Sequence, residues 1–239
     1  MGRKEDIKAI IDKAEATFPM IKKWYDESLH QQEISHKLKV EIKNYLENLR
    51  SVLDYLASEI NERYCIKKTK AYFPMSCGDA TAYSLFMKRH FLGLKDNNRL
   101  LYNLLESFQP YAPKVSSTLS SFGVLVNKNK HEELSPQTRG EKRGLKLDFR
   151  GGGGITLPPG AHITGTGRII SGGSTISLDG GTISGDSPLS QVPNGITQTV
   201  IVWISFRFDC INEEVLPFLD KILATVRKIS DDLMKILWS

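Results

Sequence analysis

Apolar residues recur every three or four positions through the first quarter of the chain, and this spacing predicts two long amphipathic helices. The first is expected over residues 3–29, bent or broken near Phe18 because Pro19 lies inside it. The second is expected to run from Ser35, which is suited to cap a helix N-terminus, to about Tyr64. A helix of about thirty residues is about 45 Å long. The pattern therefore predicts a bundle in which other helices cover its apolar stripe.

Shorter helical segments follow this long helix. The same spacing predicts helices at about residues 81–90, 98–108 and 115–128, with a proline-containing stretch between the last two. A final apolar stripe begins near Asn212 and continues to the end of the chain. This stripe predicts a closing helix that returns to the bundle.

The segment between the last two helices has a different pattern. Thirteen of the nineteen glycines fall within residues 151–195, separated by short runs of Ile, Thr, Ser and Leu. Such runs predict short strands joined by glycine turns, and an antiparallel β-meander is the simplest arrangement. In residues 200–208 apolar residues alternate with others, which predicts a longer strand whose apolar face anchors the β segment on the helices.

These elements together predict a mainly α protein. A helical bundle is expected over residues 1–143, a glycine-rich antiparallel β insertion over 144–209, and the C-terminal helix over 210–239. At 239 residues the chain is long enough to bury a substantial core. The three cysteines are far apart, and no secretory signal or membrane span is recognisable. We therefore expect a cytoplasmic protein that has no membrane partner.

The net charge of +5 is unevenly distributed. Residues 1–143 contain 24 Lys and Arg against 18 Asp and Glu, which gives +6, whereas residues 144–239 contain 8 against 9, which gives −1. A basic excess confined to the helical part suits an anionic partner such as RNA. It is equally compatible with a solvated helical surface that is rich in lysine.

The glycine-rich segment does not match a phosphate-binding loop. Gly160 and Gly165 have the spacing of a nucleotide-binding loop, but Thr166 and Gly167 follow where lysine and Ser or Thr are needed. The chain also lacks paired Cys or His residues at metal-ligand spacing. We therefore expect neither a metal nor another cofactor, and interpret the glycines as turn formers.

One polar cluster suggests chemistry. Asn127, Lys128, Asn129, Lys130 and His131 follow an apolar helical pattern, so they are expected near a helix end. Two lysines would raise the local positive potential and lower the pKa of a neighbouring imidazole, so the cluster could bind a phosphate and place a neutral base beside it. The alternative is a helix C-terminus in which Lys and His simply interact favourably with the helix dipole.

Two stretches resemble the HEPN superfamily of small helical nucleotide-binding domains. They are residues 45–56, which contain Arg50-Ser51-Val52-Leu53-Asp54, and residues 125–131, which end in the Asn-x-x-Lys-His element formed by Asn127, Lys130 and His131. Both are similar to elements of a group of uncharacterised bacterial proteins. The resemblance implies a helical bundle that binds RNA or a nucleotide, forms a homodimer through its motif helices, and belongs to a defence or toxin-related system. It also implies binding roles for Arg50 and Asp54.

The chain departs from this family at the residue that matters most for catalysis. Many HEPN proteins are metal-independent ribonucleases whose motif has an arginine, four to six further residues, and then histidine. If His131 is that histidine and Asn127 the polar residue after the arginine, the arginine position is Val126, which the helical pattern places on or beside the inward face. No arginine precedes any histidine of the chain at the required spacing. Valine cannot stabilise a phosphate, so the resemblance implies a degenerate ribonuclease site.

Three functions remain open from the sequence. The first is an RNA-binding or nucleotide-binding protein with a degenerate site. The second is an active ribonuclease with an unorthodox site that uses His131, Asn127 and Lys130. The third is a protein-interaction module that binds a partner through the β insertion.

Overall fold

The computed structural model describes residues 2–31, 34–113, 116–131, 137–171 and 173–238. Within these ranges the side chains of His30, Gln31, Lys130, His131 and Trp203 lie outside the description. The chain forms two compact units. The helical unit comprises Met1–Thr138 and Arg207–Ser239, and the β unit comprises Arg139–Phe206.

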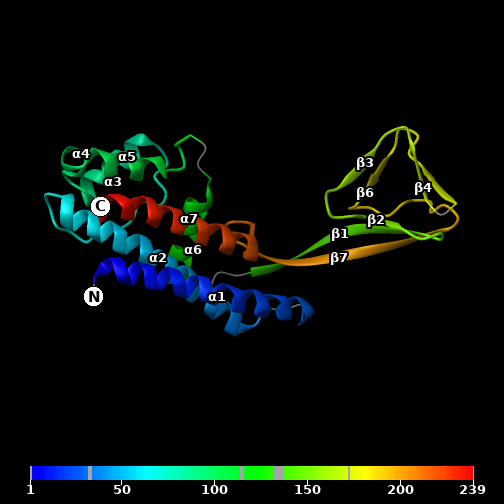
Figure 1. Ribbon diagram of the computed structural model, residues 1–239, viewed down its shortest axis with the longest axis horizontal. Coiled ribbons are helices and arrows are strands. Elements are labelled where there is room, and N and C mark those ends of the chain that lie inside the picture. Colours follow the sequence, from blue (N-terminus) through cyan, green and yellow to red (C-terminus); the bar gives the residue numbers. More distant parts are fainter. Residues whose placement is uncertain (1, 32–33, 114–115, 132–136, 172, 239) are drawn as a thin grey trace. The chain divides into compact units, whose positions relative to one another are not determined.

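In the helical unit, three long helices pack along one another (Figure 1). These are α1 (Arg3–Gln31), α2 (His36–Tyr64) and α7 (Val215–Leu237). Helix α6 (Thr118–His131) lies against both α2 and α7. The remaining helices, α3, α4 and α5, complete the unit; they are Ala80–His90, Leu94–Asn97 and Arg99–Ser107.

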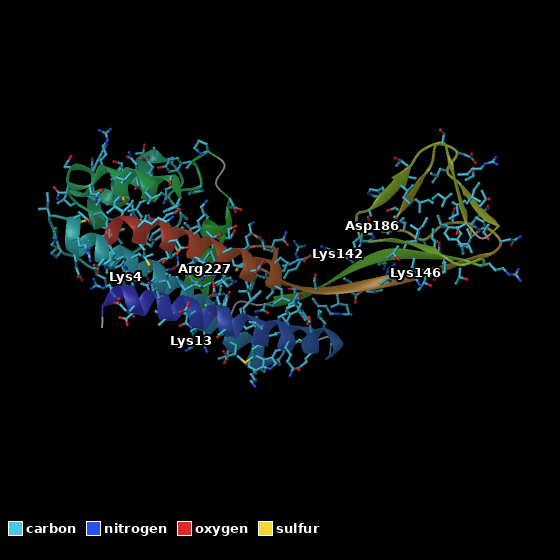
Figure 2. The ribbon with its side chains drawn as sticks, viewed as in Figure 1. Lys4, Lys13, Lys142, Lys146, Asp186 and Arg227 are labelled. Atoms are coloured by element: carbon cyan, nitrogen blue, oxygen red, sulfur yellow. The ribbon has the colours of Figure 1, made fainter. Side chains whose placement is uncertain are left out.

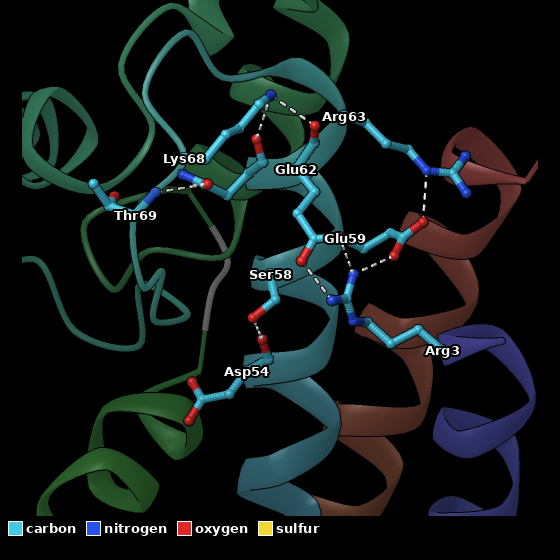
Figure 3. A network of polar contacts seen from close by, with 9 residues as sticks. Arg3, Asp54, Ser58, Glu59, Glu62, Arg63, Lys68 and Thr69 are labelled. Atoms are coloured by element: carbon cyan, nitrogen blue, oxygen red, sulfur yellow. Dashed lines mark hydrogen bonds and ion pairs between the residues drawn. The ribbon is translucent and has the colours of Figure 1, made fainter.

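Both ends of α2 are secured by side chains. At its N-terminus, Ser35 Oγ accepts a hydrogen bond from the Leu38 amide at 3.2 Å, which confirms the predicted cap. At its C-terminus, the Lys68 ammonium donates to the carbonyl of Glu62 at 2.6 Å (Figure 3) and to that of Cys65 at 2.7 Å. These contacts satisfy backbone groups that a helix end leaves without intrahelical partners.

Pro19 does not break α1, contrary to the expected bend or break near Phe18. The helix is one continuous element from Arg3 to Gln31. Ile11, Ala14 and Ile21, on both sides of the proline, are buried. Packing of this apolar face stabilises the helix enough to offset the backbone hydrogen bond that proline cannot donate.

The β unit is built from antiparallel pairs. Strand β1 (Gln137–Phe149) pairs with β2 (Gly154–Leu157), β3 (His162–Thr164) with β6 (Thr182–Ser184), and β4 (Arg168–Ser171) with β5 (Ser174–Ser177). The long strand β7 (Ile196–Phe208) lies between β1 and the short strand β8 (Glu213–Glu214). The predicted β-meander is therefore wrong. The β4–β5 hairpin is nested between β3 and β6, so β6 pairs with β3 and not with its neighbour β5.

The β unit has its own hydrophobic core, drawn from strands on all sides of the three-sided arrangement in Figure 1. Its members are Leu145, Leu147, Phe149, Leu157, Ile176, Ile183 and Ile196. The apolar face predicted for residues 200–208 is only partly buried, because Phe206 and Phe208 are 1% exposed whereas Val200 and Val202 are 43% and 48% exposed. In the helical unit, Phe208 packs edge-on against Phe218 of α7 with ring centroids 5.8 Å apart.

The prediction of a mainly α fold with a small β insertion is wrong. Of the residues that the structure describes, 52% are helical and 20% lie in strands, so the fold is mixed α/β. The strand region begins earlier than expected, at Gln137, because the charged residues 139–143 carry no apolar alternation that could reveal a strand. This region is also a compact unit with a separate core, which glycine-rich turns alone do not indicate.

Replacing Leu147 by alanine tests whether the β unit is stabilised by its own core. Leu147 is fully buried in that core, and removing such a side chain costs about 2–5 kcal/mol. We expect hydrogen exchange to accelerate in the β unit while the slowest amides of α2 keep their rates. Lys146→Ala, at the neighbouring half-exposed position, should leave the exchange rates of both units unchanged. Equal acceleration in both units would show a single cooperative core instead.

Candidate functional site

The two motif-bearing stretches, residues 45–56 and 125–131, meet in the structure. Arg50 lies on α2 and Asn127 on α6, and Arg50 Nη1 donates a hydrogen bond to Asn127 Oδ1 at 3.2 Å. On its own helix, Arg50 Nε donates to Asp54 Oδ2 at 3.1 Å. Three of the predicted site residues are thus brought together, although 77 positions separate Arg50 from Asn127.

Asp54 connects this cluster to the loop after α2. Its second oxygen, Oδ1, accepts the backbone amide of Phe73 at 3.2 Å, and the Phe73 side chain is buried. The side chains of Arg50 and Asp54 are 19% and 28% exposed. The carboxylate therefore has two fixed donors, and the guanidinium is held in one orientation at the protein surface.

The other predicted residues follow Asn127 along α6. Lys128 is half-buried and Asn129 is 7% exposed, and both residues have interactions. The helix continues through Lys130 and His131, whose side chains lie outside the described part of the chain. Asn127 is exposed. We refer to Arg50, Asp54, Asn127 and Lys128 as the α2–α6 site.

Val126 occupies the position at which an arginine would be expected if His131 were the histidine of the motif. Its side chain is 2% exposed and belongs to the core of the helical unit. The predicted inward face of this helix is confirmed, because Leu119, Phe122 and Leu125 are buried as well. A charged side chain at position 126 would therefore face the core and not the surface.

The geometry of the α2–α6 site suits recognition of an anion more than a chemical step. A guanidinium offers several N–H donors in one plane, which matches the oxygens of a phosphate. Asp54 and Asn127 hold that plane, so little side-chain entropy remains to be lost on binding. The sequence pattern could not reveal the contact between Arg50 and Asn127, because it depends on how α6 packs against α2.

A second polar network near the other end of α2 has a structural role (Figure 3). Arg3 of α1 donates to Glu59 at 2.7 Å and to Glu62 at 2.5 Å. Arg63 donates to Glu59 at 2.6 Å and also to the carbonyl of Leu237 in α7. The network thus joins three helices. The hydrogen bond from Arg3 lowers the pKa of the Glu62 carboxyl below its usual value of 4.5.

An open cleft of about 490 Å³ lies elsewhere in the helical unit. Its lining combines apolar side chains, hydroxyl groups and one opposite-charge pair on α7, and includes Leu104, Phe108, Leu119, Ile229, Lys228 and Asp232. None of the predicted site residues lines it. The cleft therefore adds nothing to the chemistry proposed from the motifs.

Comparison with known proteins gives no relative from which a function could be transferred. No family model, curated protein or solved structure matches the chain. Across the described ranges, no helix combines the length and the apolar character that crossing a membrane requires. Among the same residues, no three or more His, Cys, Asp or Glu side chains are grouped closely enough to hold a metal ion.

Substitutions of Asp54 test its part in the α2–α6 site. Asp54→Ala leaves the buried Phe73 amide and the Arg50 guanidinium without their shared acceptor, and we expect the free energy of unfolding to fall by about 1–3 kcal/mol. Asp54→Asn keeps an oxygen that can accept the Phe73 amide, so its loss should be smaller. Urea unfolding measures the free energy of unfolding of both variants. Equal losses in the two variants would mean that the Phe73 contact contributes nothing.

Acid should weaken the contact between Arg3 and Glu62. Because the folded-state pKa of Glu62 lies below 4.5, the contribution of its carboxylate to stability is complete above pH 4.5 and is lost as pH falls through the folded-state pKa. Glu62→Gln lacks this contribution at every pH. The stability difference between wild type and variant should therefore shrink between about pH 6 and pH 3. A difference that widens in acid would contradict the assignment.

Proposed function

We propose that the helical unit binds the phosphate groups of RNA at the α2–α6 site and has lost efficient cleavage. The observation that carries this proposal is the hydrogen bond of Arg50 to Asn127, which joins the two family-like stretches at the surface. Arginine held in a fixed plane is a preferred ligand of phosphate. The resemblance to HEPN proteins independently suggests an RNA or nucleotide ligand.

The charge distribution supports the same proposal. The sequence through residue 143 carries a net charge of +6, from 24 basic and 18 acidic residues. Lys128 follows Asn127 on α6 and adds a further positive charge to this end of the helix. Such a concentration of positive charge attracts a polyanion and makes its binding sensitive to salt.

The loss of cleavage is inferred from Val126. In the family motif, arginine and histidine come from the same helix at a fixed spacing, whereas here that position is filled by a buried valine. Arg50 comes from another helix and is engaged by Asp54. A guanidinium paired with a carboxylate is less available to stabilise the extra negative charge of a transition state.

Fluorescence anisotropy with a labelled single-stranded RNA tests the binding. We expect Arg50→Gln to weaken binding about tenfold or more, because a hydrogen bond to a charged group contributes about 1.5–3 kcal/mol. The slope of log affinity against log salt should fall by about 0.7 for the lost phosphate contact. Lys128→Glu should also weaken binding.

Arg89→Gln is the matched control. Arg89 is an exposed arginine on α3, so the variant removes the same charge from the same unit at another place. It should weaken binding less than Arg50→Gln does. Equal effects of the two variants would mean that binding depends on net charge alone. Absence of RNA binding at low salt would refute the proposal.

A second candidate is an active ribonuclease, which the placement of Arg50 beside Asn127 favours. In that case α2 supplies the arginine that α6 lacks, and His131 acts as the base. It predicts cleavage of RNA in the presence of a metal chelator, with loss of activity in both His131→Ala and Arg50→Gln. Cleavage that persists in His131→Ala would come from a contaminant. Absence of cleavage together with specific binding favours the degenerate site.

A further inference from the structure

The β unit has one long strand whose outer edge is uncovered. Strand β7 lies beside β1 along one edge (Figure 1), while β8 pairs only with Arg207 and Phe208 on the other. Near the start of β7, the amide of Leu189 donates to Gln198 Oε1 at 2.7 Å, so a neighbouring segment covers that end. Among the described residues, no strand pairs with residues 199–205 on the side away from β1.

This uncovered stretch has the composition of a strand that pairs. Residues 199–205 read Thr-Val-Ile-Val-Trp-Ile-Ser, with no charge, proline or glycine. Most of them are β-branched, which favours extended backbone. Proteins usually protect an exposed edge with lysine, proline or a bulge, because unpaired backbone N–H and C=O groups recruit another strand. The outer edge of β7 has no such protecting side chain.

The contrast with β1 shows that the charge is distributed unequally over the same pair of strands. Strand β2 pairs with Leu145–Asp148 of β1, and in the described part of the chain no strand pairs with residues 139–144 on this side. That stretch contains Arg139, Glu141, Lys142 and Arg143. Lys142 and Lys146 both project from β1 (Figure 2). Charged side chains thus lie along the unpaired stretch of β1, whereas residues 199–205 of β7 include no charged residue.

Two exposed side chains of β7 are apolar as well. Val200 and Val202 are 43% and 48% exposed, and they lie on the same face because side chains alternate along a strand. This uncharged aliphatic pair therefore lies beside an open edge. A partner strand would satisfy the backbone and cover the aliphatic groups together.

We propose that β7 pairs edge to edge with β7 of a second copy of this chain, in antiparallel orientation about a twofold axis near Ile201. In that register Val200 of one copy lies opposite Val202 of the other, so two aliphatic pairs form across the axis. A stretch without charge has no self-repulsion to prevent this arrangement, and identical surfaces meet in a closed dimer. The partner is therefore another copy and not a chain of complementary charge.

Sedimentation velocity and light scattering on the full chain test the dimer. Wild type should have twice the chain mass of 26.8 kDa across the micromolar range. The double variant Val200→Lys/Val202→Lys places lysines opposite lysines across the axis, and we expect it to be a monomer. Both positions are exposed in the single chain, so the circular dichroism spectrum should stay unchanged.

Two further variants separate loss of the interface from loss of folding. Ile170→Lys makes the same type of change on β4, at a side chain that is 69% exposed, and should leave the dimer intact. Val200→Glu/Val202→Glu should also be a monomer, but an equimolar mixture with the lysine variant should restore the dimer mass and lose it again in high salt.

The outcomes decide between the possible occupants of this edge. A wild-type protein that is monomeric at all concentrations would overturn the proposal, and so would a dimer that the paired lysines leave unchanged. The latter result would place the interface elsewhere, for example on the helical unit. Failure of the oppositely charged variants to associate would exclude direct β7 pairing. None of these outcomes depends on whether the α2–α6 site binds RNA.

Discussion

Burial of the apolar stripe of α2 is the constraint on which the helical unit depends. Helices α1, α6 and α7 all pack against this helix, and Leu46, Leu49 and Leu53 are completely buried. Even a polar group on this side is fixed, because the Tyr45 hydroxyl donates to the carbonyl of Leu219 in α7 at 3.4 Å. Burial there raises the pKa of Tyr45. Because one side of α2 is buried in the core, Arg50 and Asp54 lie at the edge of this buried face, where α6 can contact Arg50.

The parts of this fold that were predictable from the sequence are those governed by local periodicity and capping. The limits of α2 follow from its apolar spacing and from Ser35, and both features act within a few residues of the position they determine. The continuity of α1 through Pro19 was not predictable in the same way, because tertiary packing outweighs a local penalty. For the candidate site, the sequence indicated the residue types and the inward face of α6. The approach of Arg50 to Asn127 depends on helix packing across 77 positions, which no local pattern specifies.

The β unit shows a different limit of sequence patterns. Short strands such as β4 and β5 were recognisable because glycine turns bound them, but turns do not determine which strands pair. Nesting the β4–β5 hairpin between β3 and β6 lets Ile176 and Ile183 join the same core as Leu147. A simple meander would pair β5 with β6 instead. The nonlocal arrangement is favoured because it buries apolar surface that the separate hairpins would expose, and this burial makes the β region a structural unit.

Val126 lies at a position from which an arginine side chain could not reach the surface beside Asn127. The helical phase of α6 is fixed by Phe122 and Leu125, both completely buried, and this phase directs residue 126 into the core as well. An arginine introduced there would have to bury its charge or rotate the helix, and either change costs more than a single phosphate contact returns. A guanidinium next to Asn127 must therefore come from a neighbouring helix, and α2 supplies one. Arg50 carries a positive charge at this surface, and its contacts with Asp54 and Asn127 hold the guanidinium in place.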